Sequence, residues 1–188
     1  MDVSKTKYFP TREEWRKWLS ENFDKESEIW FVNPKKSSGK QGVLYNDAVE
    51  EALCFGWIDS TQKTLDEHHT MQRYTPRKPK SKYSQLNKER LRRLADKGLI
   101  HPQILETIKD VIEEVFVFPQ DIIKAIQQDA EAWENYQAFS DTYKRIRIAY
   151  IDTARKRPDE YKKRLQNFIQ KTKDNKLISG HGGTDLYY

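Results

Sequence analysis

The sequence predicts an α+β fold: a small antiparallel sheet of about three strands packed with helices, followed by an all-helical C-terminal module. Short runs rich in β-branched and aromatic residues stand at residues 28–32, 57–65 and 69–75, each bounded by turn-forming residues. After Pro102 the apolar residues instead recur with the helical spacing of three and four. Strands followed by a run of helices are typical of the α+β class.

The change from strand-like runs to helical spacing also indicates where the domains begin and end. The chain has 188 residues, which suits one domain or one and a half and is enough to bury a sizeable core. We expect residues 1–117 to form the α+β module and residues 118–175 to form the helical module. Residues 176–188 contain three glycines and no apolar periodicity, which predicts a flexible tail.

The first helix and strand follow from local signals. Thr11 and Glu14 form a capping box, and the apolar residues of positions 15–23 then keep helical spacing, so we expect an amphipathic helix. In residues 28–32 apolar side chains fall at both odd and even positions, which predicts a strand buried on both faces. A polar loop is expected over residues 35–42.

A second helix and a β-hairpin are expected next. Residues 46–47, Asn-Asp, can begin a helix, and Gly56 suits its end, because a positive φ is easiest without a Cβ atom. Strands over residues 57–65 and 69–75 are then joined by a turn at residues 66–67. The hairpin is expected to lie beside the earlier strand in one antiparallel sheet.

Helices account for the remaining elements. Ser84 and Ser140 can cap helices with their hydroxyl groups, whereas Pro102, Pro119 and Pro158 suit the first turn of a helix, where the missing N–H is not needed. Apolar residues continue at helical spacing after each of these positions.

Composition narrows the class of protein. Charged residues make up 34% of the chain, and aromatic residues, at 12%, supply large surfaces for burial, which indicates a folded, water-soluble protein. No run approaches the ~18 apolar residues that span a bilayer. No apolar run follows Met1 as in a secretory signal. A single cysteine, Cys54, excludes internal disulfides. We therefore expect a cytoplasmic protein.

Charge is uneven along the chain. Residues 73–93 hold nine basic residues and one acidic residue, and residues 143–173 hold eleven and three, so each stretch has a net charge of +8. Residues 103–142 hold two basic and nine acidic residues. The basic stretches can attract an anionic partner. The alternative is that the acidic helices simply pack near the basic ones.

Three features carry little functional signal. Residues 38–40, Ser-Gly-Lys, lack the flanking residues of a phosphate-binding P-loop. No two histidines have the His-x-x-x-His spacing, so neither a metal site nor a cofactor is expected. Cys54 stands in an apolar helical run without a neighbouring histidine, which favours a buried thiol over a nucleophile.

The most suggestive residues lie on the expected hairpin. Trp57 and Asp59 share one face of its first strand, and Arg73 and Thr75 share one face of its second, with Arg77 just beyond. If these faces coincide, an acid, two guanidinium groups, a hydroxyl and an indole converge. Guanidinium groups bind carboxylate or phosphate with two parallel hydrogen bonds. The alternative is a structural Asp–Arg pair with the tryptophan in the core.

The segment after the hairpin is basic. Residues 75–83, TPRKPKSKY, can follow a phosphate backbone, so non-specific binding of nucleic acid stays open. No motif for sequence-specific binding of nucleic acid is visible.

Two motifs resemble a known family. Residues 51–60, EALCFGWIDS, resemble the EALCFGWIDG signature of the YdeI/OmpD-associated family. Residues 73–77 and 81–87, RYTPR and SKYSQLN, resemble its R-F-T-P-R…S-x-W-S-x-x-N pattern, with Tyr83 in place of the usual tryptophan. A looser likeness to its helical module extends to about residue 175. The resemblance implies a part in bacteriocin tolerance or envelope association, and it implies neither a reaction nor catalytic residues.

Together, the residues and the resemblance predict a non-enzymatic bacterial protein of the cytoplasm that binds an anionic small molecule or an acidic partner. The expected groove is lined by Trp57, Asp59, Arg73, Thr75, Arg77 and Asn87. Two alternatives stay open: an enzyme in which Asp59 is a general base and Arg73 and Arg77 hold an anionic substrate, and a non-specific binder of nucleic acid. The sequence does not indicate the oligomeric state.

Overall fold

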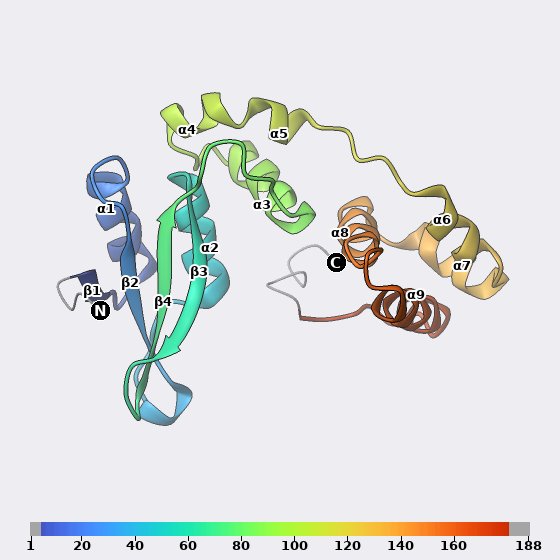
Figure 1. Ribbon diagram of the computed structural model, residues 1–188, viewed down its shortest axis with the longest axis horizontal. Helices are drawn as coiled ribbons and strands as arrows, with labels where there is room; N and C mark the ends of the chain where they lie inside the picture. The colour runs from blue at the N-terminus through green and yellow to red at the C-terminus, as the bar shows by residue number, and fades with distance from the viewer. Residues whose placement is uncertain (1–4, 181–188) are drawn as a thin grey trace. The chain divides into compact units, whose positions relative to one another are not determined.

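The computed structural model describes residues 5–180, which fall into two compact units. Of the described residues, the first unit comprises 5–82 and 90–112, and the second comprises 83–89 and 113–180. The first unit contains a sheet with helices, whereas the second is helical (Figure 1). The α+β class is therefore confirmed.

The first unit is built on a four-stranded sheet (Figure 1). Strands β1 (Thr6–Tyr8), β2 (Ile29–Pro34), β3 (Trp57–Thr64) and β4 (His69–Pro76) lie in the order β1-β2-β4-β3. The pairings β2–β4 and β4–β3 are antiparallel, as expected, but β1 pairs with β2 in parallel. The sheet is therefore mixed and has one strand more than expected, because a run of three residues is too short to reveal a period.

Two helices and a short turn complete the N-terminal part of this unit. Helix α1 (Arg12–Asn22) begins as expected, since Thr11 Oγ1 accepts a hydrogen bond of 3.3 Å from the backbone N–H of Glu14. Helix α2 (Tyr45–Cys54) follows, and the loop before it contains a 3₁₀ turn, η2 (Lys36–Ser38).

Aromatic rings form the core between α1 and the sheet. The ring of Trp15 lies 5.1 Å from that of Phe31 and 5.3 Å from that of Tyr74, and Trp18 lies 5.7 Å from Trp57. Residues 29–32 of β2 are all buried, which confirms that this strand is covered on both faces. The aromatic content of the sequence thus supplies the buried surface that the low apolar fraction does not.

Gly56 marks the turn from α2 into β3. Its φ of +72° is strained for any residue with a side chain, and an added Cβ would lie 2.9 Å from Cδ1 of Ile104. Its carbonyl oxygen accepts a hydrogen bond of 2.9 Å from the backbone N–H of Arg77. The turn from α2 into β3 therefore requires a glycine at this position of the EALCFGWIDS motif.

Helices α3 (Gln85–Asp96), α4 (Pro102–Thr107) and α5 (Lys109–Glu113) follow the sheet. The apolar period after Pro102 predicted helix, and the structure divides this helix at Ile108 into α4 and α5. The apolar residues on either side of Ile108 still recur at helical spacing, so the break between the two helices is not visible in the sequence pattern.

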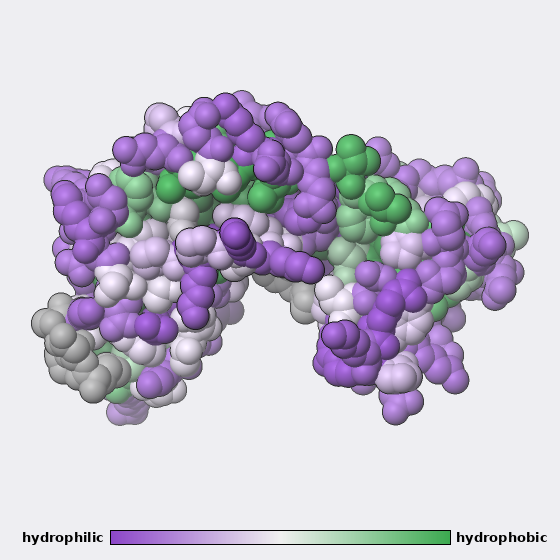
Figure 2. All heavy atoms as spheres, turned by 45° about the horizontal axis from the view of Figure 1, so that its top comes forward, coloured by the Kyte–Doolittle hydropathy of each residue, from purple (hydrophilic) through white to green (hydrophobic). Residues whose placement is uncertain are grey.

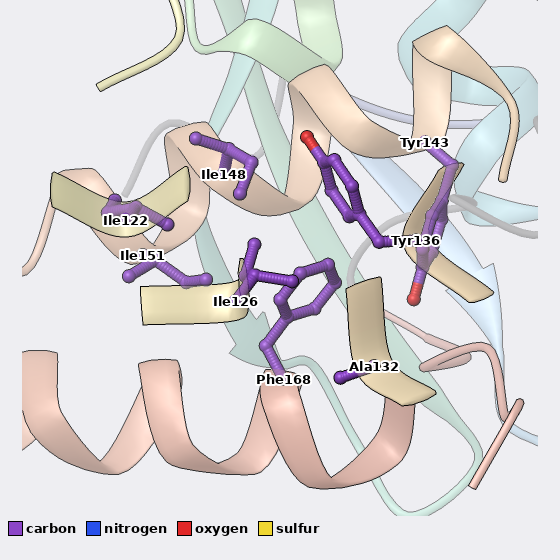
Figure 3. Packing of buried hydrophobic residues seen from close by; sticks show 8 residues of the cluster. All are labelled: Ile122, Ile126, Ala132, Tyr136, Tyr143, Ile148, Ile151 and Phe168. Atoms are coloured by element: carbon purple, nitrogen blue, oxygen red, sulfur yellow. The ribbon is translucent and has the colours of Figure 1, made fainter. Parts of the chain in front are cut away.

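The second unit contains α6 (Gln120–Gln127), α7 (Ala130–Ala138), α8 (Asp141–Asp152) and α9 (Pro158–Lys173). These helices share one buried cluster, which Figure 3 shows from close by. Its members are Ile122, Ile126, Ala132, Tyr136, Tyr143, Ile148, Ile151 and Phe168.

Polar and charged residues dominate the face of the molecule drawn in Figure 2. Within residues 5–180 no helix combines the length and the apolar character that crossing a bilayer requires. Of the tail expected over residues 176–188, residues 181–188 lie outside the described residues. The described part, residues 176–180, has no regular secondary structure, and Ile178 packs against the cluster of the second unit.

Candidate functional site

The register of the hairpin separates residues that the sequence analysis had grouped. Asp59 pairs with Tyr74 across the two strands, so Asp59 and Trp57 share a face with the even-numbered residues of β4. Arg73 and Thr75 therefore point to the opposite face. The expected convergence of these side chains is wrong, because a sequence shows the alternation within each strand but not the register between strands.

Trp57 and Arg73 both have partners within the first unit. Trp57 is fully buried, and its indole Nε1 donates a hydrogen bond of 3.0 Å to the carbonyl oxygen of Phe23. On the opposite face, Nε and Nη2 of Arg73 lie 2.7 and 2.6 Å from Oε2 of Glu28. The indole thus belongs to the core, and the carboxylate that pairs with Arg73 is Glu28 rather than Asp59.

Asp59 is held by neutral groups. Its Oδ2 accepts hydrogen bonds from the hydroxyl of Tyr45 at 2.8 Å and from Nε2 of Gln72 at 3.5 Å. Burial, followed by the hydrogen bond to Asp59, raises the pKa of Tyr45 to about 12, so this phenol stays protonated and donates. The buried hydroxyl of Tyr74 has no hydrogen-bond partner within residues 5–180.

Thr75, Arg77 and Asn87 are the other three expected residues. Thr75 is half-buried on the face away from Asp59. Nη2 of Arg77 donates a hydrogen bond of 3.1 Å to Oγ of Ser81, which folds this side chain back onto its own loop. Asn87 belongs to the second unit. Contact of these residues with a ligand stays a prediction.

A cavity of about 330 Å³ lies in the second unit, between α8, α9 and the segment that follows α9. Arg147, Tyr150 and Ile151 of α8 line it, at intervals of three and one that keep them on one helix face. The lining residues of α9, from Glu160 to Phe168, are spaced in the same manner. Ile151 and Phe168 also belong to the core cluster that Figure 3 shows, so part of the cavity lining is continuous with the packed interior.

Arg164 is held firmly at this cavity. Its Nη1 donates a hydrogen bond of 2.7 Å to the carbonyl oxygen of Tyr150, and its Nε donates one of 2.7 Å to Oε1 of Glu160. The guanidinium also lies 3.7 Å from the centre of the Tyr150 ring, close enough for a cation–π contact. Within residues 5–180 its Nη2 makes no hydrogen bond, so one donor nitrogen is available.

Arg147 holds the segment after α9 in place at the cavity. It is 3% exposed, and its Nη2 donates a hydrogen bond to the carbonyl oxygen of Ile178. The backbone N–H of Ile178 donates in turn to the hydroxyl of Tyr143 at 2.9 Å. The segment after α9 is therefore tied to α8 by both of its backbone groups at Ile178.

The cavity lining is positively charged. Three cations, Arg147, Lys163 and Arg164, stand against one carboxylate, Glu160, and 3 − 1 gives a net charge of +2. The hydrogen bond from Arg164 lowers the pKa of Glu160, so this carboxyl is ionised at neutral pH. A net positive charge above an apolar floor suits a small organic anion.

Two family models match separate parts of the chain. A family model described as a domain of unknown function, DUF8412, matches residues 7–107, more than half of the chain. The chain belongs to this family. A second model, described as bacteriocin-protection, YdeI or OmpD-associated, matches residues 115–175.

The YdeI/OmpD-associated domain thus contains α6 to α9 and most of the cavity lining. The suspected YdeI/OmpD relationship is confirmed at these residues. The EALCFGWIDS and RYTPR motifs lie instead within the DUF8412 match. No curated protein and no solved structure matches this chain.

The cavity residues were not predicted from the sequence, although a signal for them is present there. The basic stretch of residues 143–173 contains all three cations of the lining. Lys163, Arg164 and Asn167 also show the spacing of one helix face. Which of the many basic residues meet depends on how α8 packs against α9, and the sequence does not reveal that. Within residues 5–180 no group of three or more His, Cys, Asp or Glu side chains is placed to hold a metal ion.

Proposed function

We propose that the YdeI/OmpD-associated domain binds a small organic carboxylate, and that the protein acts by binding it. The cavity between α8 and α9 is the site. One observation carries the proposal: Arg164 lines a cavity of net positive charge and is fixed by two hydrogen bonds and a ring contact, while its Nη2 makes no hydrogen bond within residues 5–180. Pre-organised guanidinium groups of this kind bind carboxylates without losing much side-chain entropy.

The apolar part of the lining supports a ligand with an apolar body. Ile151, Phe168 and the ring of Tyr150 contribute carbon surface, and the volume of about 330 Å³ lies at the lower end of small-molecule sites. A carboxylate head is expected to contact Arg164, while an aromatic or aliphatic body covers the floor. Benzoate and hexanoate have this form, and acetate has the head without the body.

A ligand panel tests the proposal. Thermal unfolding and calorimetric titration with benzoate, hexanoate and acetate should give saturable binding for the first two and much weaker binding for acetate. Arg164→Gln should weaken benzoate binding about tenfold or more, since a hydrogen bond to a charged group contributes ~1.5–3 kcal/mol.

Two neighbouring lysines supply a matched pair of variants. Lys163 lines the cavity, whereas Lys162 is exposed and does not. Lys163→Gln should weaken benzoate binding and Lys162→Gln should leave it unchanged, although both variants remove one positive charge from α9. Equal effects of the two variants, or no saturable binding of benzoate and hexanoate, would reject this site.

The family match supports a resemblance to bacteriocin-protection proteins at the level of the family. We extend the proposal to this role: capture of the carboxylate contributes to tolerance in the cell. Cells that make the Lys163→Gln protein should then survive bacteriocin less well than cells that make the Lys162→Gln protein at equal abundance.

A further inference from the structure

A second cavity, of about 290 Å³, lies within the first unit, on α1, α2 and the C-terminal part of α3. Its lining contains four cations, Arg12, Arg16, Arg93 and Lys97, and two carboxylates, Glu50 and Glu51. The net charge of the lining is 4 − 2, or +2. It shares no residue with the cavity of the second unit or with the site expected on the hairpin.

The charges in this cavity are arranged in two layers. The side chains of Glu50 and Glu51 are only 3% and 4% exposed, whereas those of Arg12, Arg16 and Arg93 are 32%, 35% and 26% exposed. The carboxylates therefore lie deepest, and the guanidinium groups lie between them and the solvent. A ligand that enters the cavity meets positive charge first.

The buried carboxylates fix the guanidinium groups in place. Oε1 and Oε2 of Glu51 each accept a hydrogen bond of 2.6 Å, the first from Arg12 and the second from Arg16. Glu50 accepts from Arg93 through Oε1 and from Arg12, at 3.4 Å, through Oε2. All four carboxylate oxygens are thus used to orient arginines, which pre-organises the outer layer.

Lys97 is the one cation of this lining that the network does not use. It follows α3 directly, is exposed, and forms no hydrogen bond or ion pair within residues 5–180. Three guanidinium groups in fixed positions and one long, adaptable ammonium group are well matched to a tetrahedral oxyanion, which accepts several hydrogen bonds at once. The lining has a charge of +2, and the cluster stays positive, at +1, when Asp47, 2.6 Å from Nη1 of Arg12, is counted as well, so an anion is favoured.

We propose that this cavity binds the phosphoryl group of a phosphate dianion. Arg12, Arg16 and Arg93 form its fixed wall, and Lys97 closes over the bound group. This site is independent of the proposed carboxylate cavity, because it lies in the other unit and uses different residues.

Titration with inorganic phosphate and with glycerol 3-phosphate at constant ionic strength tests the proposal. Lys97→Gln removes a cation without touching the ion-pair network, and Lys17→Gln, on the exposed part of α1, is its matched control. We expect saturable binding of phosphate to the wild type, a loss of about three- to tenfold in affinity for Lys97→Gln, and no change for Lys17→Gln. Tighter binding of the ester than of phosphate would identify a phosphomonoester as the ligand, and the reverse order would identify free phosphate.

Two results would overturn the proposal. One is the absence of saturable binding of either phosphate compound to the wild type. The other is equal binding to the wild type and to Lys97→Gln. Neither result bears on the carboxylate cavity, which is tested with benzoate and the Lys163→Gln variant.

Discussion

The ion pairs around Glu51 make a quantitative prediction about stability. Replacing Glu51 by Gln keeps the size of the side chain but removes the charge that Arg12 and Arg16 contact at 2.6 Å. The new amide also brings N–H donors against guanidinium donors. Because Glu51 is 3% exposed, water cannot easily replace the lost partner.

The expected loss of stability follows from these contacts. Removing one partner of a buried ion pair costs ~3–5 kcal/mol. Here the two guanidinium groups are about one third exposed, at 32% and 35%, and Arg12 keeps Asp47 and Glu50 as partners. Solvent and these partners offset part of the cost, so we expect Glu51→Gln to lower the free energy of unfolding by ~2–3 kcal/mol.

Urea unfolding followed by tryptophan fluorescence measures this loss. Four of the five tryptophans, Trp15, Trp18, Trp30 and Trp57, lie in the first unit and report its unfolding. The urea midpoint should fall by about 1 M or more, given a slope of ~2 kcal/mol per M. The exposed Glu21→Gln on α1 should change stability by less than ~0.5 kcal/mol. Equal midpoints for the two variants would refute the argument that Glu51 organises α1 and α2.

Four further predictions concern Cys54, Gly56 and Glu89. Burial raises the pKa of Cys54 to about 11 from 9.0, so its thiol should resist modification at pH 8 until urea unfolds the protein. As the pH rises, the thiol of the unfolded chain loses its proton before the buried thiol of the folded chain does. The free energy of unfolding should therefore fall between pH 9 and pH 11, and it should fall less in Cys54→Ala. Denaturant titrations across this pH range measure the difference. Gly56→Ala should lower thermal stability by ~1–3 kcal/mol, because its φ is +72° and its Cβ would contact Ile104. Glu89→Gln should destabilise the second unit by ~2–3 kcal/mol in thermal unfolding followed by circular dichroism, because Glu89 is 3% exposed and accepts two hydrogen bonds, at 2.7 and 2.8 Å, from Arg145.

Each of these predictions has a contrary result. Rapid modification of the native thiol at pH 8 would mean that Cys54 is not buried. Equal alkaline loss of stability in the wild type and in Cys54→Ala would assign that loss to other groups. An alanine at position 56 with wild-type stability would show that the turn after α2 tolerates a side chain, and a neutral Glu89→Gln would show that the pair with Arg145 is dispensable.

Local signals in the sequence predicted most of the elements. The Thr11 cap, the positive φ at Gly56 and the cap at Ser140, whose Oγ accepts from the N–H of Tyr143 at 3.2 Å, all depend on neighbouring residues only. Such interactions can be recognised in a sequence because they depend on the residue types and the spacing of a few adjacent positions.

Features that depend on distant residues could not be predicted in this way. The short strand β1 exists because Thr6 to Tyr8 find a partner in β2, residues 30–32. The register that separates Asp59 from Arg73 is set by packing against the rest of the first unit. The two cavities likewise combine residues from separate helices, such as Arg147 with Arg164.

The most direct test of the carboxylate site is a nuclear magnetic resonance titration of the labelled protein with benzoate. We predict saturable shifts that are largest at the side-chain Nε–H of Arg164 and at the backbone of residues 163–168 and 178–179. Shifts confined to residues 5–82, or weak shifts scattered over both units without saturation, would contradict the account.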